Sequence, residues 1–250
     1  MIFCFSATGN SRYVAGALGD LLDDKIVMLP TDVNRFEITE EESIGFVFPV
    51  YSWGPPPIVE KFILSLGKLK SKYVWMVCTC GDDVGKTPEI VDKALRQLGL
   101  RLNSAFSVVM PNTYLLLPGF NLDSREVEDE KLKKSTSRIK EIVSHLLRRD
   151  ECVDVVRGKF AGLKSGIVRS WFNRYSLDPG KWHYTSKCVG CGLCARKCPV
   201  GNISQKRCSS VFRPEWGDNC IGCMACYHWC PENAIQYSKC TKGKGQYHFP

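Results

Sequence analysis

Residues 188–203 read CVGCGLCARKCPVGNI, and residues 220–235 read CIGCMACYHWCPENAI. The two segments align without a gap at a constant offset of 32 residues, from Cys188 to Cys220 and from Cys198 to Cys230. Each contains four cysteines in the spacing C-x2-C-x2-C-x3-C and continues with a proline. Self-similarity of this kind indicates a duplicated structural unit. This part of the chain therefore predicts a small domain built from two equivalent halves.

The cysteine spacing predicts two 4Fe-4S clusters. In runs of this type, three thiolates bind one cluster and the fourth binds the other. One cluster is then expected on Cys188, Cys191, Cys194 and Cys230. The other is expected on Cys220, Cys223, Cys226 and Cys198. Structural zinc sites use paired ligands rather than two such triples, and disulfide frameworks belong to short exported chains, so the sequence favours iron-sulfur over both alternatives.

Small residues stand between the ligand positions, namely Gly190, Gly192, Gly222 and Ala225. They are expected to let backbone amides approach the sulfides of the clusters. Six further cysteines lie outside both runs: Cys4, Cys78, Cys80, Cys152, Cys208 and Cys240. We expect Cys208 and Cys240 to be spare thiols.

On these motifs, residues 188–235 resemble the dicluster ferredoxin family. The resemblance implies a small α+β domain, which we place over residues 184–250. It also implies that each cluster carries one electron at low potential.

The first half of the chain alternates short apolar runs with longer segments of helical period. Strands are expected at 2–5, 26–29, 44–48, 74–79 and 107–110, and helices at 11–22, 57–66, 88–98 and 124–148. This order predicts an α/β domain over residues 1–150, with helices on both faces of a five-stranded parallel, doubly wound sheet. The last helix is expected to cover the sheet with one apolar stripe: Val127, Leu132, Ile139, Ile142, Val143 and Leu146.

Residues 151–183 are expected to form a connector that contains a short helix, because several glycines and the turn at 178–180 interrupt the pattern. One helical face of this segment is apolar and is expected to dock on one of the two domains: Ile167, Val168, Trp171, Phe172 and Tyr175.

Residues 5–11 read FSATGNS and join the first expected strand to the first expected helix. Side chains of Ser6, Thr8, Asn10 and Ser11 could converge there on a phosphate, together with the free N–H groups of the helix N-terminus. Gly9 would permit a close backbone approach. An ordinary helix cap is the alternative interpretation. The segment matches neither the Walker loop nor the dinucleotide-binding fingerprint.

FSATGNS is similar to the FMN-phosphate loop of the flavodoxin family, and the resemblance covers about residues 1–150. It implies that the FMN phosphate binds Ser6, Ala7, Thr8, Gly9, Asn10 and Ser11. It also implies that the flavin ring lies at the carboxyl ends of the strands. The ring would then be lined by Tyr51, Trp53 and Gly54 after the third strand, and by Cys80, Gly81 and Asp82 after the fourth. The chain departs from the family in lacking an aromatic residue in this last loop, and no histidine accompanies Cys80 to make it a nucleophile.

The formal net charge of +8 is divided unevenly. Residues 1–120 carry 11 Lys and Arg against 13 Asp and Glu, whereas residues 121–250 carry 23 against 13. Two clusters of about −2 each and an FMN phosphate would bring the total to roughly +2. Because the basic residues are dispersed and form no nucleic-acid motif, we expect no nucleic-acid partner. No segment has the pattern of a membrane span or of a signal peptide, so we expect a cytoplasmic protein.

The combination of both motifs resembles the flavodoxin-ferredoxin fusion proteins of anaerobic microbes. This resemblance implies single-electron transfer between the clusters and FMN, and exchange with other redox proteins. The alternative is an FMN-dependent reductase of a small acceptor such as a quinone or free flavin. The sequence leaves open whether the protein is an enzyme, and it leaves the oligomeric state open.

Overall fold

The computed structural model describes residues 1–30, 41–67, 72–117, 119–175, 177–208 and 211–249. The chain forms two compact units. The first consists of Met1–Ser6, Asn10–Pro111 and Arg125–Ser170, and the second of Ala7–Gly9, Asn112–Ser124 and Trp171–Pro250.

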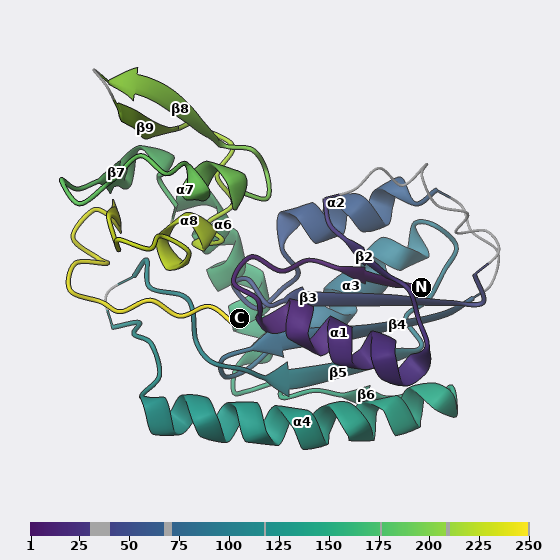
Figure 1. Cartoon of the computed structure of the whole chain (residues 1–250). Coiled ribbons are helices and arrows are strands. Elements are labelled where there is room, and N and C mark those ends of the chain that lie inside the picture. The colour runs from purple at the N-terminus through teal and green to yellow at the C-terminus, as the bar shows by residue number, and fades with distance from the viewer. Residues whose placement is uncertain (31–40, 68–71, 118, 176, 209–210, 250) are drawn as a thin grey trace. The chain divides into compact units, whose positions relative to one another are not determined.

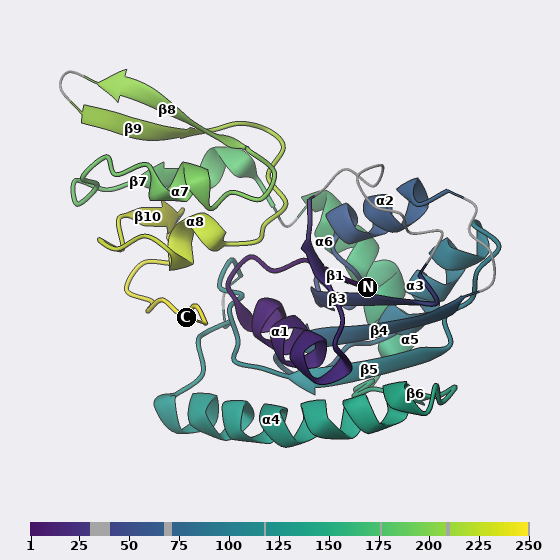
Figure 2. The same cartoon turned by 45° about the vertical axis from the view of Figure 1, so that its right-hand side comes forward.

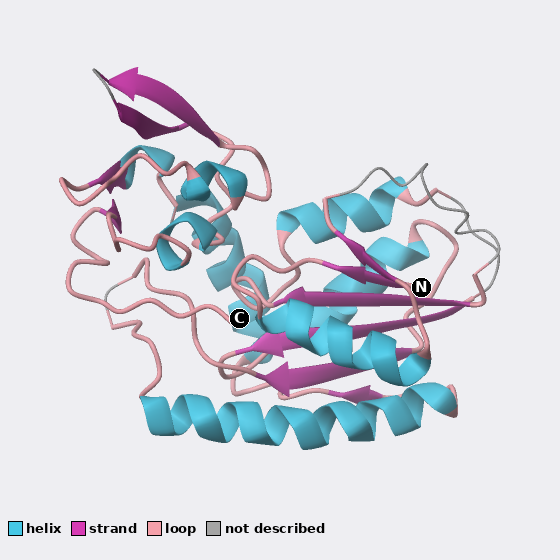
Figure 3. Ribbon diagram, in the orientation of Figure 1, coloured by secondary structure: helices cyan, strands magenta, loops and turns pink. Residues whose placement is uncertain are grey.

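The first unit is built on a parallel sheet of six strands in the order β2-β1-β3-β4-β5-β6 (Figure 1). The strands are β1 Ile2–Cys4, β2 Ile26–Met28, β3 Ser43–Pro49, β4 Tyr73–Cys80, β5 Ser104–Val109 and β6 Val153–Asp154. The helices are α1 Asn10–Leu22, α2 Pro57–Ser65, α3 Thr87–Arg96 and α4 Arg125–Leu147. Figure 3 shows α1 and α4 on one face of the sheet and α2 and α3 on the other. The doubly wound α/β fold expected from the sequence is confirmed.

The sixth strand lies within the segment that the sequence assigns to the connector. β6 pairs in parallel with β5, at Ala105↔Val153 and Phe106↔Asp154. A strand of two residues, both exposed, carries no hydrophobic pattern, and hydropathy therefore gave no signal for it.

The apolar stripe expected on α4 covers the sheet over only part of its length. Ile139, Ile142, Val143 and Leu146 are buried, but Val127 is 39% exposed. The first turns of α4 extend past the end of β5 (Figures 1 and 2), so Val127 has no strand to cover.

The connector contains a continuous helical segment, made of α5 Ala161–Leu163, the π-helix η3 Lys164–Val168 and α6 Arg169–Tyr175 (Figure 2). The expectation that its apolar face docks is wrong for Ile167, which is 73% exposed. Trp171 is 54% exposed, and the side chain of Tyr175 lies outside the described residues. Phe172 of the same face does pack, with its ring centroid 5.5 Å from that of Tyr114. The face therefore docks only in part.

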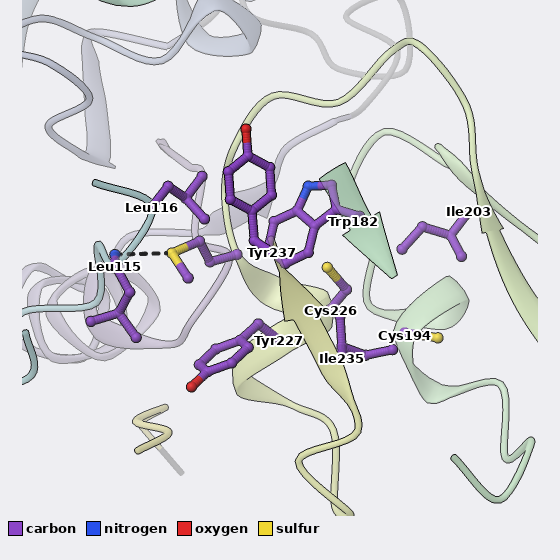
Figure 4. Close-up of a cluster of buried hydrophobic side chains, with 10 residues drawn as sticks. Leu115, Leu116, Trp182, Cys194, Ile203, Cys226, Tyr227, Ile235 and Tyr237 are labelled. Carbon is purple, nitrogen blue, oxygen red and sulfur yellow. Dashed lines mark hydrogen bonds between the residues drawn. The ribbon is translucent and has the colours of Figure 1, made fainter. Parts of the chain in front are cut away.

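The second unit repeats one short helix, α7 Leu193–Arg196 and α8 Ala225–His228, at equivalent places in the two cysteine runs. Between the runs lies a hairpin of β8 Ile203–Cys208 and β9 Val211–Trp216. β7 Trp182–Tyr184, preceded by the 3-10 helix η4 Pro179–Lys181, pairs antiparallel with β10 Ile235–Tyr237. These elements enclose a core of buried side chains around Trp182, Tyr227 and Tyr237 (Figure 4).

A search of the described residues for membrane-crossing helices finds none with the required length and apolar character.

The centre of the sheet depends on one glycine. A Cβ at Gly45 in β3 would lie 2.2 Å from Cζ2 of Trp75 in β4. Trp75 is 1% exposed, and its indole Nε1 donates a hydrogen bond of 3.0 Å to Ser43 Oγ. The indole therefore has little freedom to move away from an added methyl group.

We expect Gly45→Ala to lower the free energy of unfolding by about 1–3 kcal/mol, the usual effect of overpacking a core. Urea denaturation followed by circular dichroism measures the change. Gly16→Ala in α1 is the matched control, because a Cβ there meets nothing within 4 Å and alanine favours a helix. Equal stability of Gly45→Ala and the wild type would contradict the expectation.

Candidate cofactor sites

Four cysteines of the second unit line one hollow of about 340 Å³: Cys188, Cys191, Cys194 and Cys230. Three of them belong to the first run, and Cys230 comes from the second. These are the residues that the spacing predicts for one cluster. Gln205 and Pro214 of the β8–β9 hairpin line the same hollow.

The other predicted set is also brought together. The pKa of Cys223 is raised to about 12, mainly by burial, with Cys220 and Cys198 contributing to the increase. Burial likewise raises the pKa of Cys220, with Cys198 again acting as a neighbouring charge. Cys198 of the first run thus lies among the thiols of the second. Among the described residues, no three His, Cys, Asp or Glu side chains are close enough to hold a single metal ion.

Backbone N–H groups point at the fourth cysteine of each run. Asn202 N–H donates to Cys198 Sγ at 3.2 Å, and Ala234 N–H donates to Cys230 Sγ at 3.3 Å. The two bonds occupy equivalent places, four residues after the cysteine. Hydrogen bonds of this kind favour the thiolate over the thiol and are part of the environment that iron-sulfur clusters require. Both donor sets therefore fit a cluster.

Left-handed residues stand at equivalent places in the two cysteine runs. Gly190 and Gly222 have positive φ angles of 75° and 67°. Ala225 begins α8. The left-handed position is Met224, with φ of 59°, opposite Gly192 with φ of 71°. The sequence does not predict that Met224 adopts the conformation of Gly192, because methionine is not a typical turn residue.

The loop between β1 and α1 has the backbone geometry of an anion site. α1 begins at Asn10, and its first N–H groups lack partners within the helix. Gly9 precedes it with φ of 102°, a conformation that L side chains rarely adopt. The loop thus fits a phosphate through its backbone.

Two of the side chains expected to bind this phosphate are used to anchor the helix. Ser11 Oγ lies 2.8 Å from Thr79 Oγ1 of β4. Asn10 Nδ2 donates a hydrogen bond of 2.9 Å to the carbonyl of Pro111. Ser6 and Thr8 therefore remain the main side-chain candidates for the phosphate.

The loop after β3 is a tight turn. Tyr51 N–H donates to Gly54 O at 2.9 Å, and Gly54 N–H donates back to Tyr51 O at 3.2 Å. Ser52 and Trp53 at its centre both have positive φ, as in a type I′ turn. The turn presents Tyr51 edge-on to Phe5 and places Trp53 where Lys164 Nζ lies 5.3 Å from its ring centroid.

Cys80 ends β4 and is followed by Gly81 and Asp82. The pKa of the Cys80 thiol is raised to about 12, mainly by burial, with Asp82 contributing to the increase. The thiol is therefore protonated near neutral pH and is a poor nucleophile.

Arg169 of the connector, which the sequence did not single out, holds the turn after β3. Its guanidinium is almost fully buried and donates 2.8 Å to Tyr51 O and 2.9 Å to Pro55 O. A Cβ at Gly54 would lie 2.1 Å from Arg169 Nη1. Gly54, expected to contact the cofactor, therefore makes room for this arginine.

Two neighbours of Arg169 join the turn to the loop after β4. Ser165 Oγ donates to Trp53 O at 2.8 Å and accepts from Lys86 N–H at 2.7 Å. Lys164 Nζ pairs with Asp83 at 2.6 Å. The sequence of the connector does not predict these contacts, because polar residues of a loop-rich segment are normally solvated.

A doubly wound sheet, joined in one chain to two sets of four thiols that fit 4Fe-4S clusters, defines an electron-transfer protein. Residues 1–127 match the model of the flavodoxin domain, and residues 187–235 match that of the 4Fe-4S dicluster domain. The first match covers just over half of the chain, which therefore belongs to the flavodoxin domain family. Its cofactors are FMN and 4Fe-4S clusters.

Several solved structures are similar to this chain. The two-electron reduced flavodoxin of Megasphaera elsdenii has 16% identity over 43% of this chain and 85% of its own, with a TM-score of 0.35. The FMN-bound flavodoxin of Fusobacterium nucleatum has 12% identity over 60% and 96%, with a TM-score of 0.38. The NAD(P)H:quinone oxidoreductase of Methanothermobacter marburgensis has 13% identity over 58% and 94%, with a TM-score of 0.34. No curated protein matched the chain.

Cys230 belongs to the second run but lines the hollow with three cysteines of the first. Its substitution therefore tests whether one cluster takes ligands from both runs. We expect Cys230→Ser to remove the cluster of the first run, so that iron falls from roughly eight to roughly four atoms per chain. Iron and acid-labile sulfide assays on anaerobically purified protein measure this loss. Cys208→Ser, at an exposed cysteine outside both runs, should retain all the iron. Full iron content in Cys230→Ser would contradict the crossed assignment.

Arg169→Ala should loosen the turn after β3, because it leaves Tyr51 O and Pro55 O without their donor. We expect FMN affinity to fall about tenfold or more, since leaving a buried carbonyl without its donor costs on the order of 1–3 kcal/mol. Titration by flavin fluorescence measures the affinity. Lys159→Ala, at an exposed position ten residues earlier, is the control. Equal affinities in the two variants would exclude this positioning role.

Proposed function

We propose that the protein relays single electrons between its two clusters and its FMN and exchanges them with other redox proteins. The hollow lined by Cys188, Cys191, Cys194 and Cys230 carries the proposal. Because each set of four thiols draws on both runs, the two clusters must lie close together. Close spacing suits electron transfer between them.

The cofactors supply the chemistry, since a flavin takes one or two electrons and each cluster takes one. The protein binds and orients them. His228 is a buried titratable side chain near the cysteines, and burial lowers its pKa to about 4. Its Nε2 lies 2.7 Å from Thr113 O, and its Nδ1 accepts from Tyr247 N–H at 3.2 Å. The ring is therefore neutral and structural rather than an acid-base catalyst.

The first cluster site is the better candidate for exchange with a partner. Cys191 is exposed, and Val189 beside it is 60% exposed. At the other site Cys226 is buried and Cys198, Cys220 and Cys223 are half-buried. Lys187 and Arg196 are exposed next to the first site, which supports an acidic surface on the partner.

Stopped-flow reduction with dithionite tests the relay in holoprotein containing both kinds of cofactor. The clusters and the flavin should be reduced one after the other. In one kinetic phase, the absorption of one cofactor should show its reoxidation while the absorption of the other shows its reduction. Steady turnover with a quinone or free flavin, faster than electron delivery to a protein acceptor, would instead support a reductase of small acceptors.

Ser6→Ala combined with Thr8→Ala should cost FMN while leaving iron intact, because the hydroxyls serve only the phosphate loop. We expect FMN affinity to fall about tenfold or more for the loss of two hydrogen bonds to a charged group. Flavin fluorescence and iron assays on the same sample measure both effects. Unchanged flavin affinity would place the phosphate elsewhere.

A further inference from the structure

Residues 246–249 lie directly on the loop that follows β1. The N–H of Phe249 donates a hydrogen bond of 2.8 Å to the carbonyl of Thr8. A Cβ at Gly9 would lie 2.5 Å from the carbonyl oxygen of Phe249 and 2.7 Å from its Cβ. All of these residues belong to the second unit. The glycine at position 9 therefore allows two stretches of backbone within this unit to touch.

Trp229 holds the same loop from the second cysteine run. Its indole Nε1 donates a hydrogen bond of 2.9 Å to the carbonyl of Ala7. The ring of His248 stacks on the indole, with centroids 3.9 Å apart and planes inclined by 15°. Lys197 Nζ lies 3.8 Å from the centroid of the same indole. At these distances the two groups cannot share one face, so the indole is held between them.

Residues 246–249 are also fixed by bonds that do not involve the loop. Gln246 Nε2 donates a hydrogen bond of 2.8 Å to the carbonyl of Cys230. Tyr247 N–H donates a hydrogen bond of 3.2 Å to Nδ1 of His228, which is buried. The two donors to the loop therefore come from a well-packed part of the second unit.

These two donors determine where the amide groups of the loop point. In a planar trans peptide, the C=O and the N–H that follows it are directed to opposite sides. The carbonyls of Ala7 and Thr8 face their donors, so the next N–H groups, those of Thr8 and Gly9, face away from them. Among the described residues, neither N–H has a hydrogen-bond partner. Two free donors thus stand just before the first turn of α1.

Such an arrangement suits a phosphate. Successive backbone N–H groups in a turn form a concavity that binds anions, and the first N–H groups of a helix add to it. Loops are mobile on their own, and carbonyls that turned toward the anion would repel it. Bonds that hold the carbonyls on the other side therefore keep the N–H groups available to the ligand.

We propose that Trp229 and the backbone of Phe249 position the phosphate loop, so that its N–H groups donate to the phosphate of FMN. They do so by holding the carbonyls of Ala7 and Thr8 away from the ligand. The inference rests on the proposed function, because it requires the FMN phosphate to bind residues 6–11. It gives a role in flavin binding to residues that the flavodoxin motif does not contain.

The test is a titration of flavin-free, cluster-containing protein with FMN and with riboflavin, followed by flavin fluorescence. Trp229→Phe keeps an aromatic ring against His248 but loses the N–H. We expect its FMN affinity to fall about three- to tenfold, as for one hydrogen bond. Riboflavin has no phosphate and should bind as it does to the wild type. In the control Trp216→Phe both affinities should be unchanged, because that indole N–H has no acceptor among the described residues.

A second pair of variants isolates the other donor. Phe249→Pro removes the backbone N–H, whereas Phe249→Ala retains it. FMN affinity should be about three- to tenfold lower in the proline variant than in the alanine variant, with no difference for riboflavin. If Trp229→Phe loses iron, this pair decides, because residue 249 lies outside both cysteine runs.

An equal loss of FMN and riboflavin affinity would indicate a general disturbance of the fold and would overturn the positioning role. Wild-type FMN affinity in Trp229→Phe and Phe249→Pro would also overturn it. If Ser6→Ala with Thr8→Ala then still lowers FMN affinity, the phosphate loop stands without this inference. Wild-type FMN affinity in all of these variants would overturn both.

Discussion

The crossing of the fourth cysteine is the constraint on which the second unit depends. One hollow is lined by three thiols of the first run and by Cys230 of the second, so the two runs must pack against each other to form it. The chain turns after the fourth cysteine of each run. This turn allows Asn202 N–H to donate to Cys198 Sγ and Ala234 N–H to donate to Cys230 Sγ. Burial raises the pKa of thiols such as Cys223, so iron must displace protons from them. Folding, metal binding and proton release are therefore linked.

In the first unit, too, a residue from a distant part of the chain completes a local structure. Here the residue is Arg169, and it acts through hydrogen bonds. Three loops at the carboxyl ends of parallel strands are where a doubly wound sheet binds its ligand, but loops are individually mobile. Arg169 is drawn from a segment more than a hundred residues later and donates to two carbonyls of the turn after β3. A buried guanidinium without acceptors would be costly, so these bonds and the turn stabilise each other. The segment that leaves the sheet thereby fixes one of its ligand loops.

The sequence predicted those features that depend on local pattern. The alternation of apolar runs located five strands and four helices, and the repeat of 188–203 in 220–235 marked the two thiol sets. Features that depend on distant packing gave no signal. β6 is too short to carry a pattern, Val127 continues its stripe beyond the sheet, and Met224 adopts a glycine-like conformation. The role of Arg169 depends on what lies opposite it, which spacing along the chain does not encode.

The two thiol sites illustrate two ways of accommodating negative charge. At the more exposed site, Arg196 and Arg213 bind the carbonyls of Cys191 and Cys188, and solvent can share the cost of holding a cation there. At the other site, where none of the four cysteines is exposed, a cation would lose more of its hydration, which can exceed what it gains from the cluster. A backbone N–H such as that of Asn202, which donates to Cys198 Sγ, carries no net charge and loses far less on burial.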